Sequence, residues 1–431
     1  MKRELGLTGV VVTVVGYVIG ASIFVLPGQL AGATGPAVVL AYALAAVIAV
    51  FSCIVAAQLG SVFPKTGAGY VAIARLVSPM GGFVTIWLML AVYILAIALI
   101  ASGFADYFTR LFPAVNHTAA AYGVVLFFGI INLGGARSLI NLQTLLVLLF
   151  MLALVAVCVG GMAAVKSENI TPFIPLGMKP VMQAVVPAFF SYGGFMVVME
   201  LAGEIRRPAR TIPLGLALSF VVVLATYICL SLALVGSIPW QTLGTLKAPV
   251  SHLAEILFGE WGGTFVAVAA VGAAATSVNA LILVASRDII ALAEAGVFSG
   301  KLRDGDGGES RSRNSVILVV FFSVVALMLG QTVMEYAVWV SGVTLLYQVI
   351  IGVAMLRILS KEPEAYAAAG FKLGRFGLLA GGIGMILISS LFLYFVLEGS
   401  ELRIFAALGY LMIGISYYLV RKRKVGVEGW V

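Results

Sequence analysis

The chain has 431 residues, of which 62% are hydrophobic and only 10% are charged, and its mean hydropathy is +1.13. A soluble protein of this length needs far more charge on its surface. The charged residues lie in short clusters between apolar runs, which excludes a disordered chain, a coiled coil and a disulfide-built secreted module. The composition therefore indicates a polytopic helical membrane protein.

The net charge of +8 does not indicate nucleic-acid binding, because the basic residues flank apolar runs rather than lining one face of a helix. Cys53, Cys158 and Cys229 each lie inside an apolar run, where cysteine usually serves as a small hydrophobic residue. His117 and His252 are the only histidines, too few to build a His/Cys metal site. We therefore expect no nucleic-acid partner, no metal and no cofactor.

Twelve apolar runs are long enough to cross a bilayer as helices, at about twenty residues each. They lie near residues 7–34, 36–61, 82–108, 119–135, 139–165, 180–203, 211–236, 262–294, 314–330, 334–358, 375–397 and 402–420. A porin-type barrel would instead show weak alternation over about ten residues. The predicted fold is an all-α polytopic membrane protein with twelve transmembrane helices, the first of them retained rather than cleaved as a signal peptide.

The distribution of Lys and Arg predicts the orientation of the chain. All but five of the 26 basic residues fall on one side if the chain alternates across the membrane twelve times. The exceptions are Arg110, Lys166, Lys179, Lys247 and Arg403. Since positive charge accumulates on the cytoplasmic side, we expect a multi-pass protein of the cell (inner) membrane with both termini in the cytoplasm.

Two of the predicted spans contain residues that disfavour an unbroken helix. The first has glycines at 16 and 20 and a Pro-Gly pair at 27–28, and the sixth has Pro187 followed by Gly193 and Gly194. Glycine weakens a helix and proline removes a backbone donor, so we predict a central break in each span. Close helix packing is the alternative role for such glycines.

A break at mid-membrane exposes amide and carbonyl groups that hydrocarbon cannot satisfy, so these groups face a ligand or water. Helix N-termini then suit an anion, and exposed carbonyls suit a cation. A zwitterion such as an amino acid carries both charges. The two breaks are also five spans apart, which predicts a 5+5 inverted repeat over residues 1–165 and 180–358, followed by two additional helices over 375–424.

Several stretches resemble the amino acid/polyamine/organocation transporter superfamily. Residues 20–28, with the sequence GASIFVLPG, are similar to its broken first helix, although Ser22 replaces the usual last glycine. Residues 63–70 resemble its connection between spans two and three, 204–213 its loop after span six, and 285–287 the end of its span eight. The resemblance covers nearly the whole chain and implies secondary active transport of amino acids or related amines by alternating access, without enzyme activity.

The resemblance also implies a substrate site. Backbone amides around Ala21, Ser22 and Ile23 would bind the carboxylate, and carbonyls near Ile19 and in 191–194 would bind the ammonium. Phe190 stands where the family often has an aromatic lid, although it can equally pack in the core. The implied substrate-binding residues are Ile19, Gly20, Ala21, Ser22, Ile23, Ser191, Tyr192, Gly193, Gly194, Phe195 and Met196.

Met196 indicates the charge of the substrate. Relatives that handle cationic substrates place an acidic residue at this position, and a second buried ammonium without a carboxylate costs several kcal/mol. A neutral amino acid is therefore favoured. A cationic amino acid or polyamine exchanger, and an amino acid sensor built on a transporter fold, stay as alternatives.

The coupling ion is left open. Glu200 is a candidate proton site, with an ion pair to nearby arginines as its alternative role. Some proton-coupled relatives have a lysine in span five, where this chain has Phe150. Thr276 and Ser277, with carbonyls of Gly16 and Ile19, are candidate sodium ligands, although such hydroxyls also bond to their own helix. Sodium symport, proton symport and exchange are all compatible with these residues.

Two other classes of membrane protein fit less well. A major facilitator would have a long middle loop, whereas the connection after the sixth span is short. A membrane-embedded enzyme would need a buried acid–base or metal cluster, which the sequence does not offer. The expected partners are a small amino acid or amine and the lipid bilayer; the oligomeric state is not determined by an apolar surface.

Overall fold

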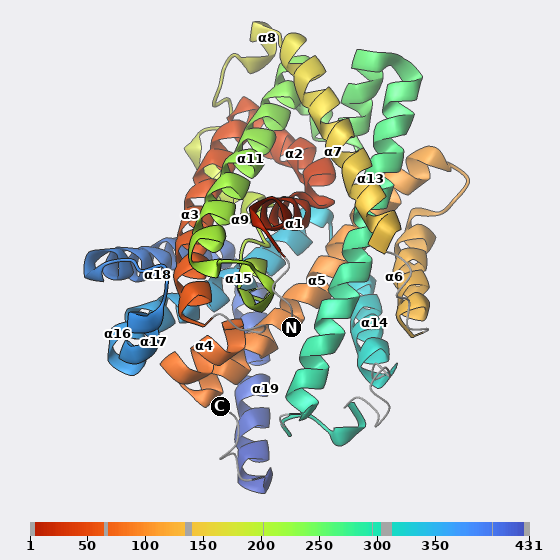
Figure 1. The fold of residues 1–431 in the computed structure, drawn as a ribbon. Coiled ribbons are helices and arrows are strands. Elements are labelled where there is room, and N and C mark those ends of the chain that lie inside the picture. The colour runs from red at the N-terminus through yellow and green to blue at the C-terminus, as the bar shows by residue number, and fades with distance from the viewer. Residues whose placement is uncertain are drawn as a thin grey trace.

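The computed structural model describes residues 5–63, 68–133, 140–200, 202–294, 296–302, 313–398 and 400–425. These residues are almost entirely helical and contain no β-strand, only an isolated bridge between Leu5 and Ile205. Figure 1 shows one bundle of helices, with α1 seen end-on near its centre. The prediction of an all-α fold is confirmed.

The first half of the chain forms twelve helical elements. They are α1 (Leu7–Ile19), α2 (Ser22–Thr34), η1 (Gly35–Ala37), α3 (Val38–Val62), α4 (Ala68–Leu76), α5 (Pro79–Leu111), α6 (His117–Leu133), α7 (Ile140–Ala163), α8 (Ser167–Ile170), α9 (Met178–Phe190), α10 (Val197–Glu200) and η2 (Ala202–Glu204).

The second half contains the longest helices. Its elements are α11 (Pro208–Ser237), α12 (Trp240–Leu243), α13 (Pro249–Glu294), η3 (Gly300–Leu302), α14 (Arg313–Met328), α15 (Val333–Leu356), α16 (Ile358–Lys361), α17 (Pro363–Ala368), α18 (Arg375–Leu397) and α19 (Glu401–Val425). The element α13 consists of two helical segments that meet at a kink at Gly259, whose φ of 74° is not helical.

Seven helical stretches of the described chain are long and apolar enough to cross a membrane. They are Ser22–Val62, Pro79–Leu111, Pro208–Ser237, Pro249–Glu294, Val333–Leu356, Arg375–Leu397 and Glu401–Lys422. Four shorter apolar helices accompany them: Leu7–Ile19, His117–Leu133, Leu148–Ala163 and Arg313–Met328. Since each crossing needs about twenty apolar residues, the chain is a multi-pass membrane protein.

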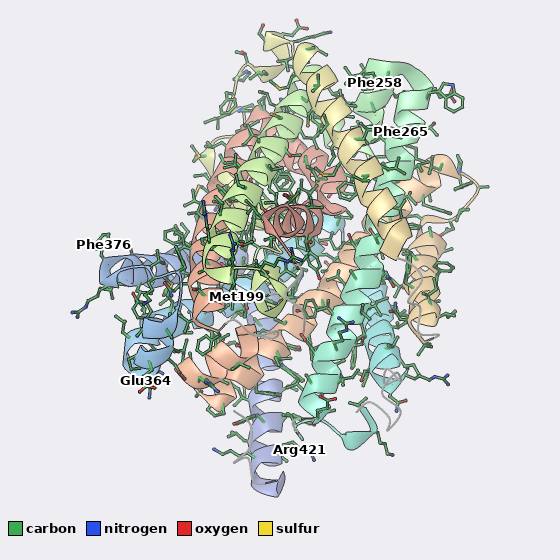
Figure 2. All side chains as sticks on the ribbon, viewed as in Figure 1. Met199, Phe258, Phe265, Glu364, Phe376 and Arg421 are labelled. Carbon is green, nitrogen blue, oxygen red and sulfur yellow. The ribbon has the colours of Figure 1, made fainter. Side chains whose placement is uncertain are left out.

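The outer surface of the bundle carries large apolar side chains. Phe376 on α18 is 85% exposed and projects from the bundle in Figure 2, as does Phe265 on α13, whereas Met199 on α10 is buried inside. A soluble protein rarely exposes so many large apolar groups in contiguous patches. This surface is therefore suited to lipid.

The first predicted break lies where the sequence places it. The helix α1 ends at Ile19, α2 begins at Ser22, and Gly20 between them has a φ of 35°. Positive φ is accessible to glycine because it lacks a Cβ atom. Pro27 lies inside α2, beyond the break, and does not end the helix.

The second break is longer. The helix α9 ends at Phe190, residues 191–196 form turns, and α10 begins at Val197. Gly194 has a φ of 124°, which again requires glycine. Pro187 lies inside α9, just before the break. Both interruptions predicted from glycine and proline are present.

Long helices enclose the two interruptions. The helix α5 packs against α6, α13 and α15, while α11 packs against α1, α3 and α7.

The last helix, α19, attaches to α5 through Trp87 and Tyr410. The Trp87 indole N–H donates to the Tyr410 carbonyl over 3.0 Å, and the Tyr410 hydroxyl donates to the Trp87 carbonyl over 2.6 Å.

Candidate functional site

The two interruptions lie against each other. A Cβ atom placed on Gly194 would lie 3.2 Å from a methyl carbon of Val18 and 3.5 Å from the carbonyl oxygen of Tyr17. Position 194 therefore lies in close contact with the last turn of α1. The helices α2 and α9 also pack together, so the predicted residues of both spans meet in one place.

A tyrosine from a third helix joins the two breaks. The Tyr227 hydroxyl on α11 lies 2.6 Å from the carbonyl oxygen of Ser191 and 3.2 Å from that of Val18. Tyr227 is fully buried. The last carbonyls of a helix lack partners within it, and one hydroxyl here satisfies such groups from both interrupted helices.

Two further tyrosines surround this contact. The rings of Tyr42 and Tyr227 stack with centroids 5.3 Å apart, and the Tyr192 and Tyr227 rings meet edge-to-face at 5.0 Å. The Tyr192 hydroxyl donates to the carbonyl oxygen of Tyr42 over 3.1 Å. We call Tyr42, Tyr192 and Tyr227 the tyrosine cluster.

Two hydroxyls at the tyrosine cluster are buried, lie close to each other and make no well-aligned hydrogen bond among the described residues. They are the hydroxyls of Tyr42 and Ser191, and both residues have zero exposure. Most buried polar groups in proteins are paired. These two hydroxyls lie next to the second break, where they keep capacity for a further hydrogen bond to a polar molecule or water.

The predicted anion-binding residues stand at the first turn of α2. Ala21, Ser22 and Ile23 are all buried, and the first N–H groups of a helix have no partner within it. The N–H of Phe24 donates back to the Ala21 carbonyl over 3.2 Å. The positive end of the α2 dipole therefore lies inside the protein, next to the break.

The predicted residues of the second break either form its turns, as residues 191–193 do, or pack in the interior, as Phe195 does. The N–H groups of Ser191, Tyr192 and Gly193 donate to carbonyls three residues earlier, over 2.9–3.0 Å, which closes the break into tight turns. Gly193 is exposed, whereas Phe195 is buried and its ring packs against Phe220 on α11 at 6.0 Å. Phe195 therefore belongs to the packed interior.

Phe190 and Met196 flank the second break. Phe190 ends α9, and Met196 precedes α10; both are partly buried and pack against the hydrophobic core. Their side chains provide apolar surface next to the backbone groups of the turn. No structural feature here assigns a lid role to Phe190, which stays a prediction.

Of the candidate sodium ligands, Thr276 and Ser277 lie on α13, and Gly16 and Ile19 lie on α1. The position of a Cβ on Gly20 is 3.5 Å from the Ser277 hydroxyl oxygen, which brings α13 to the first break. Ser277 and Thr276 both donate to the Ala273 carbonyl, over 2.8 and 3.0 Å. The hydroxyls thus bond to their own helix, as the alternative interpretation expected, while their lone pairs stay available.

Two other predicted positions have different outcomes. The Glu200 side chain lies outside the described part of the chain, as do residues 64–67 of the second family-like stretch. Phe150, at the span-five position where some relatives have lysine, is 1% exposed and meets Phe24 edge-to-face at 6.5 Å. An aromatic contact therefore occupies this place beside α2.

Sequence reasoning missed the residues that hold the site together. Tyr227 and Tyr42 lie in apolar runs and match none of the stretches that resemble the family. The available signal was chemical: a tyrosine in the middle of a membrane span needs a partner for its hydroxyl. Tyr107 on α5 gives a second example, because its hydroxyl donates to the carbonyl of Phe24 in α2.

Among the described residues no group of three or more His, Cys, Asp or Glu side chains could hold a metal ion. The chemistry of the site therefore rests on backbone dipoles, hydroxyls and aromatic rings. Such groups can bind and orient a small zwitterion.

Comparison with known proteins identifies the family of the chain. The amino acid permease family profile matches residues 5–416. The branched-chain amino acid permease BcaP of Bacillus subtilis is 26% identical over 98% of this chain and 94% of its own length. BcaP of Lactococcus lactis is 30% identical over 55% of this chain and 56% of its own. The human cationic amino acid transporter 4 is 26% identical over 69% of this chain and 51% of its own.

The family profile covers nearly the entire chain, including both interrupted helices. The residues that suggested the amino acid/polyamine/organocation superfamily fall within this range. The chain belongs to the amino acid permease family of that superfamily.

Proposed function

We propose that the protein is a secondary active transporter of neutral amino acids, with branched aliphatic side chains as its preferred substrates. The observation that carries the proposal is that the Tyr227 hydroxyl contacts carbonyl groups of both interrupted helices. This contact brings the last turn of α1 and the Ser191 carbonyl together inside the bundle, and α2 begins three residues after Ile19. Backbone groups of both polarities suit a zwitterion.

The proposed preference for a neutral side chain rests on what surrounds these groups. Ile23, Phe190 and Met196 offer apolar surface at the two breaks. A second ammonium would have no carboxylate to pair with at position 196 and would cost several kcal/mol. Two of the relatives are named for branched-chain amino acids, which agrees with an apolar pocket of this kind.

We propose that the chain crosses the cell (inner) membrane twelve times and that both termini lie in the cytoplasm. In this topology residues 1–165 and 180–358 form two inverted repeats of five spans, and 375–424 add two more. Alternating access would then arise from movement of one group of helices around the breaks. Cysteine labelling of single-cysteine variants from each side of sealed vesicles tests the topology.

Sodium is our proposed coupling ion. The Ser277 hydroxyl donates a hydrogen bond to the Ala273 carbonyl, and its oxygen lies next to Gly20 at the first break, where it can still accept a ligand. Together with Thr276 and the carbonyls of Gly16 and Ile19, it would supply the several oxygen ligands that a sodium ion requires. Phe150 in place of lysine favours this arrangement over a fixed positive charge.

Uptake by the purified protein in liposomes tests both parts of the proposal. Radiolabelled isoleucine, leucine, valine, alanine and lysine would be supplied with a sodium gradient, a pH gradient or neither. We expect concentration of the branched-chain substrates driven by sodium. Accumulation of substrate driven only by the pH gradient would identify a proton, rather than sodium, as the coupling ion. Uptake that requires substrate inside the liposomes would identify an exchanger.

A cationic substrate is the second candidate, because the human relative is named a cationic amino acid transporter. Lysine uptake that exceeds leucine uptake in the same assay would favour it. Tight binding of an amino acid without any flux would instead indicate a sensor.

A further inference from the structure

A cavity of about 470 Å³ lies between α5, α6 and α13. Its wall is formed by carbon atoms of phenylalanine, valine, alanine and glycine residues, among them Phe104 and Phe108 on α5 and Phe128 on α6. Water needs two to four polar partners to occupy a buried site, and an amino acid needs partners for two charges. The lining offers neither, so an apolar ligand is required.

The cavity is open toward the side of the bundle. Phe127, at its rim on α6, is 59% exposed, and Val115 is 37% exposed. Gly123 also lines the cavity, and a Cβ atom placed on it would meet nothing within 4 Å. Because α5 is long and apolar enough to span a membrane and α6 is a shorter apolar helix beside it, this opening faces lipid rather than water.

The shape of the cavity favours an extended chain. The lining residues on α6 run from Ala119 to Phe128, a rise of more than about 12 Å at 1.5 Å per residue. Those on α5 run alongside, from Phe104 to Phe108. An alkyl chain that lies parallel to α6 fits such a slot, as the chains of lipids lie along the membrane normal.

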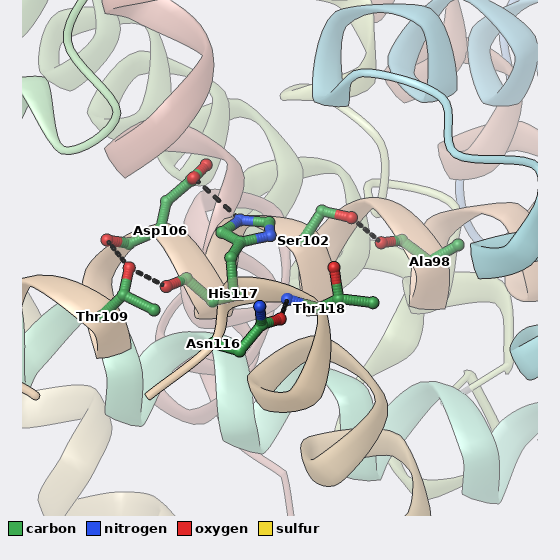
Figure 3. A network of polar contacts seen from close by, with 8 residues as sticks. Ala98, Ser102, Asp106, Thr109, Asn116, His117 and Thr118 are labelled. Carbon is green, nitrogen blue, oxygen red and sulfur yellow. Dashed lines mark hydrogen bonds and ion pairs between the residues drawn. The ribbon is translucent and has the colours of Figure 1, made fainter. Parts of the chain in front are cut away.

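A polar pair marks one end of the slot. The Nε2 atom of His117 lies 3.0 Å from Oδ1 of Asp106, with side-chain exposures of 37% and 9%. Figure 3 shows the two side chains facing each other between α5 and α6. His117 begins α6, whose first turn is capped by the Asn116 side chain bonding to the N–H of Thr118 over 2.8 Å. The apolar slot thus has a polar pair beside the end where α6 begins, just before the first α6 residue that lines it.

We propose that this cavity is a binding site for a membrane phospholipid, with one acyl chain in the slot and the headgroup at the Asp106–His117 end. A phospholipid is amphipathic, and the site likewise has an apolar slot with a polar pair beside one end. The chain would contact Ala275, which precedes Thr276 and Ser277 on the helix that borders Gly20. Lipid binding at this site does not depend on the proposed substrate or coupling ion.

The test is photolabelling of the full-length protein in vesicles of phosphatidylethanolamine and phosphatidylglycerol. A minor fraction of the phosphatidylethanolamine carries a diazirine in the middle of one acyl chain. After irradiation, mass spectrometry locates the adducts. We expect more adducts on the α5 and α6 residues of the cavity than on outward-facing α19 residues such as Met412, which is 67% exposed.

The Gly123→Trp variant fills the slot and should lose these adducts. Exclusion of even two methylene groups lowers affinity about tenfold, so we expect cavity labelling to fall by about that factor. Gly409→Trp is the matched control, because a Cβ on Gly409 also meets nothing within 4 Å but lies on α19. Its cavity labelling should equal that of the wild type.

Ala120→Phe provides a second way to fill the slot if Gly123→Trp does not insert, since Ala120 also lines the cavity. Labelling of the cavity that equals labelling of α19 in the wild type would overturn the proposal. Labelling that persists in both filled variants would do the same, because the lipid would then be bound only at the general surface.

Discussion

The hydroxyl of Tyr227 donates to the carbonyl oxygen of Ser191 over 2.6 Å. The same hydroxyl lies 3.2 Å from the Val18 carbonyl, at the other interrupted helix. A residue that does not belong to either break thus fixes the distance between them. Since both breaks would contribute to one substrate site, the position of α11 controls the geometry of that site.

Replacing Tyr227 with phenylalanine should impair transport more than it impairs folding. The ring contacts with Tyr42 and Tyr192 are kept, but two buried carbonyls lose a donor. Hydrogen bonds of this kind in membranes contribute about 1 kcal/mol, so we expect a modest fall in the melting temperature. Misplacement of the breaks should reduce the uptake rate about tenfold. Uptake in liposomes and thermal unfolding in detergent measure the two effects.

The control for this variant is Tyr394→Phe, because Tyr394 lies on α18 and is 61% exposed. Its uptake and melting temperature should match the wild type. Full uptake by the Tyr227→Phe protein would contradict the proposed role of Tyr227 in holding the breaks together.

Replacing Gly20 with valine should abolish uptake while the protein still inserts into the membrane. Gly20 has a φ of 35°, and a β-branched residue in this region costs about 1–2 kcal/mol or more. The added side chain would also project toward Ser277. Substrate flux, together with membrane yield and gel-filtration profile, separates the two effects. Gly409→Val, on an open face of α19, should transport normally.

The sequence predicts those parts of the fold that depend on local chemistry. Gly20 and Gly194 mark the breaks because glycine adopts positive φ far more readily than other residues, and apolar runs predict helices because lipid requires internal hydrogen bonding. The positions of Ala21, Ser22 and Ile23 at the start of α2 follow from the first break alone.

The tertiary contacts of the site were not predictable in the same way. Tyr227, Tyr42 and Tyr107 are separated from the breaks by tens of residues, and nothing in their local sequence indicates a partner near the breaks. Hydropathy does not distinguish a tyrosine that packs against lipid from one that bonds to a distant carbonyl. The back-bonding of Ser277 to Ala273 was likewise one of two readings that a hydroxyl in a helix allows.

Replacing Met196 with glutamate should change substrate preference. Met196 follows the second break and is partly buried, so a carboxylate there would lie near the bound side chain and pair with a second positive charge. We expect lysine to compete for leucine uptake in the variant, and leucine uptake to fall about tenfold because an unpaired buried charge is costly. Met196→Gln has a similar shape without the charge and should not admit lysine. Equal lysine exclusion by both variants would count against a substrate contact at position 196.

Replacing Arg421 with glutamine should loosen the connection after α13. The Arg421 guanidinium donates to the carbonyls of Gly296, Val297 and Phe298 over 3.0, 2.9 and 3.3 Å. Charge-assisted bonds of this kind contribute about 1.5–3 kcal/mol in proteins, and glutamine is too short to replace all three. Hydrogen exchange of residues 296–302 should accelerate about tenfold. Lys422→Gln removes an adjacent but exposed charge and should leave this exchange unchanged, whereas equal acceleration in both variants would mean that only the net charge of α19 matters.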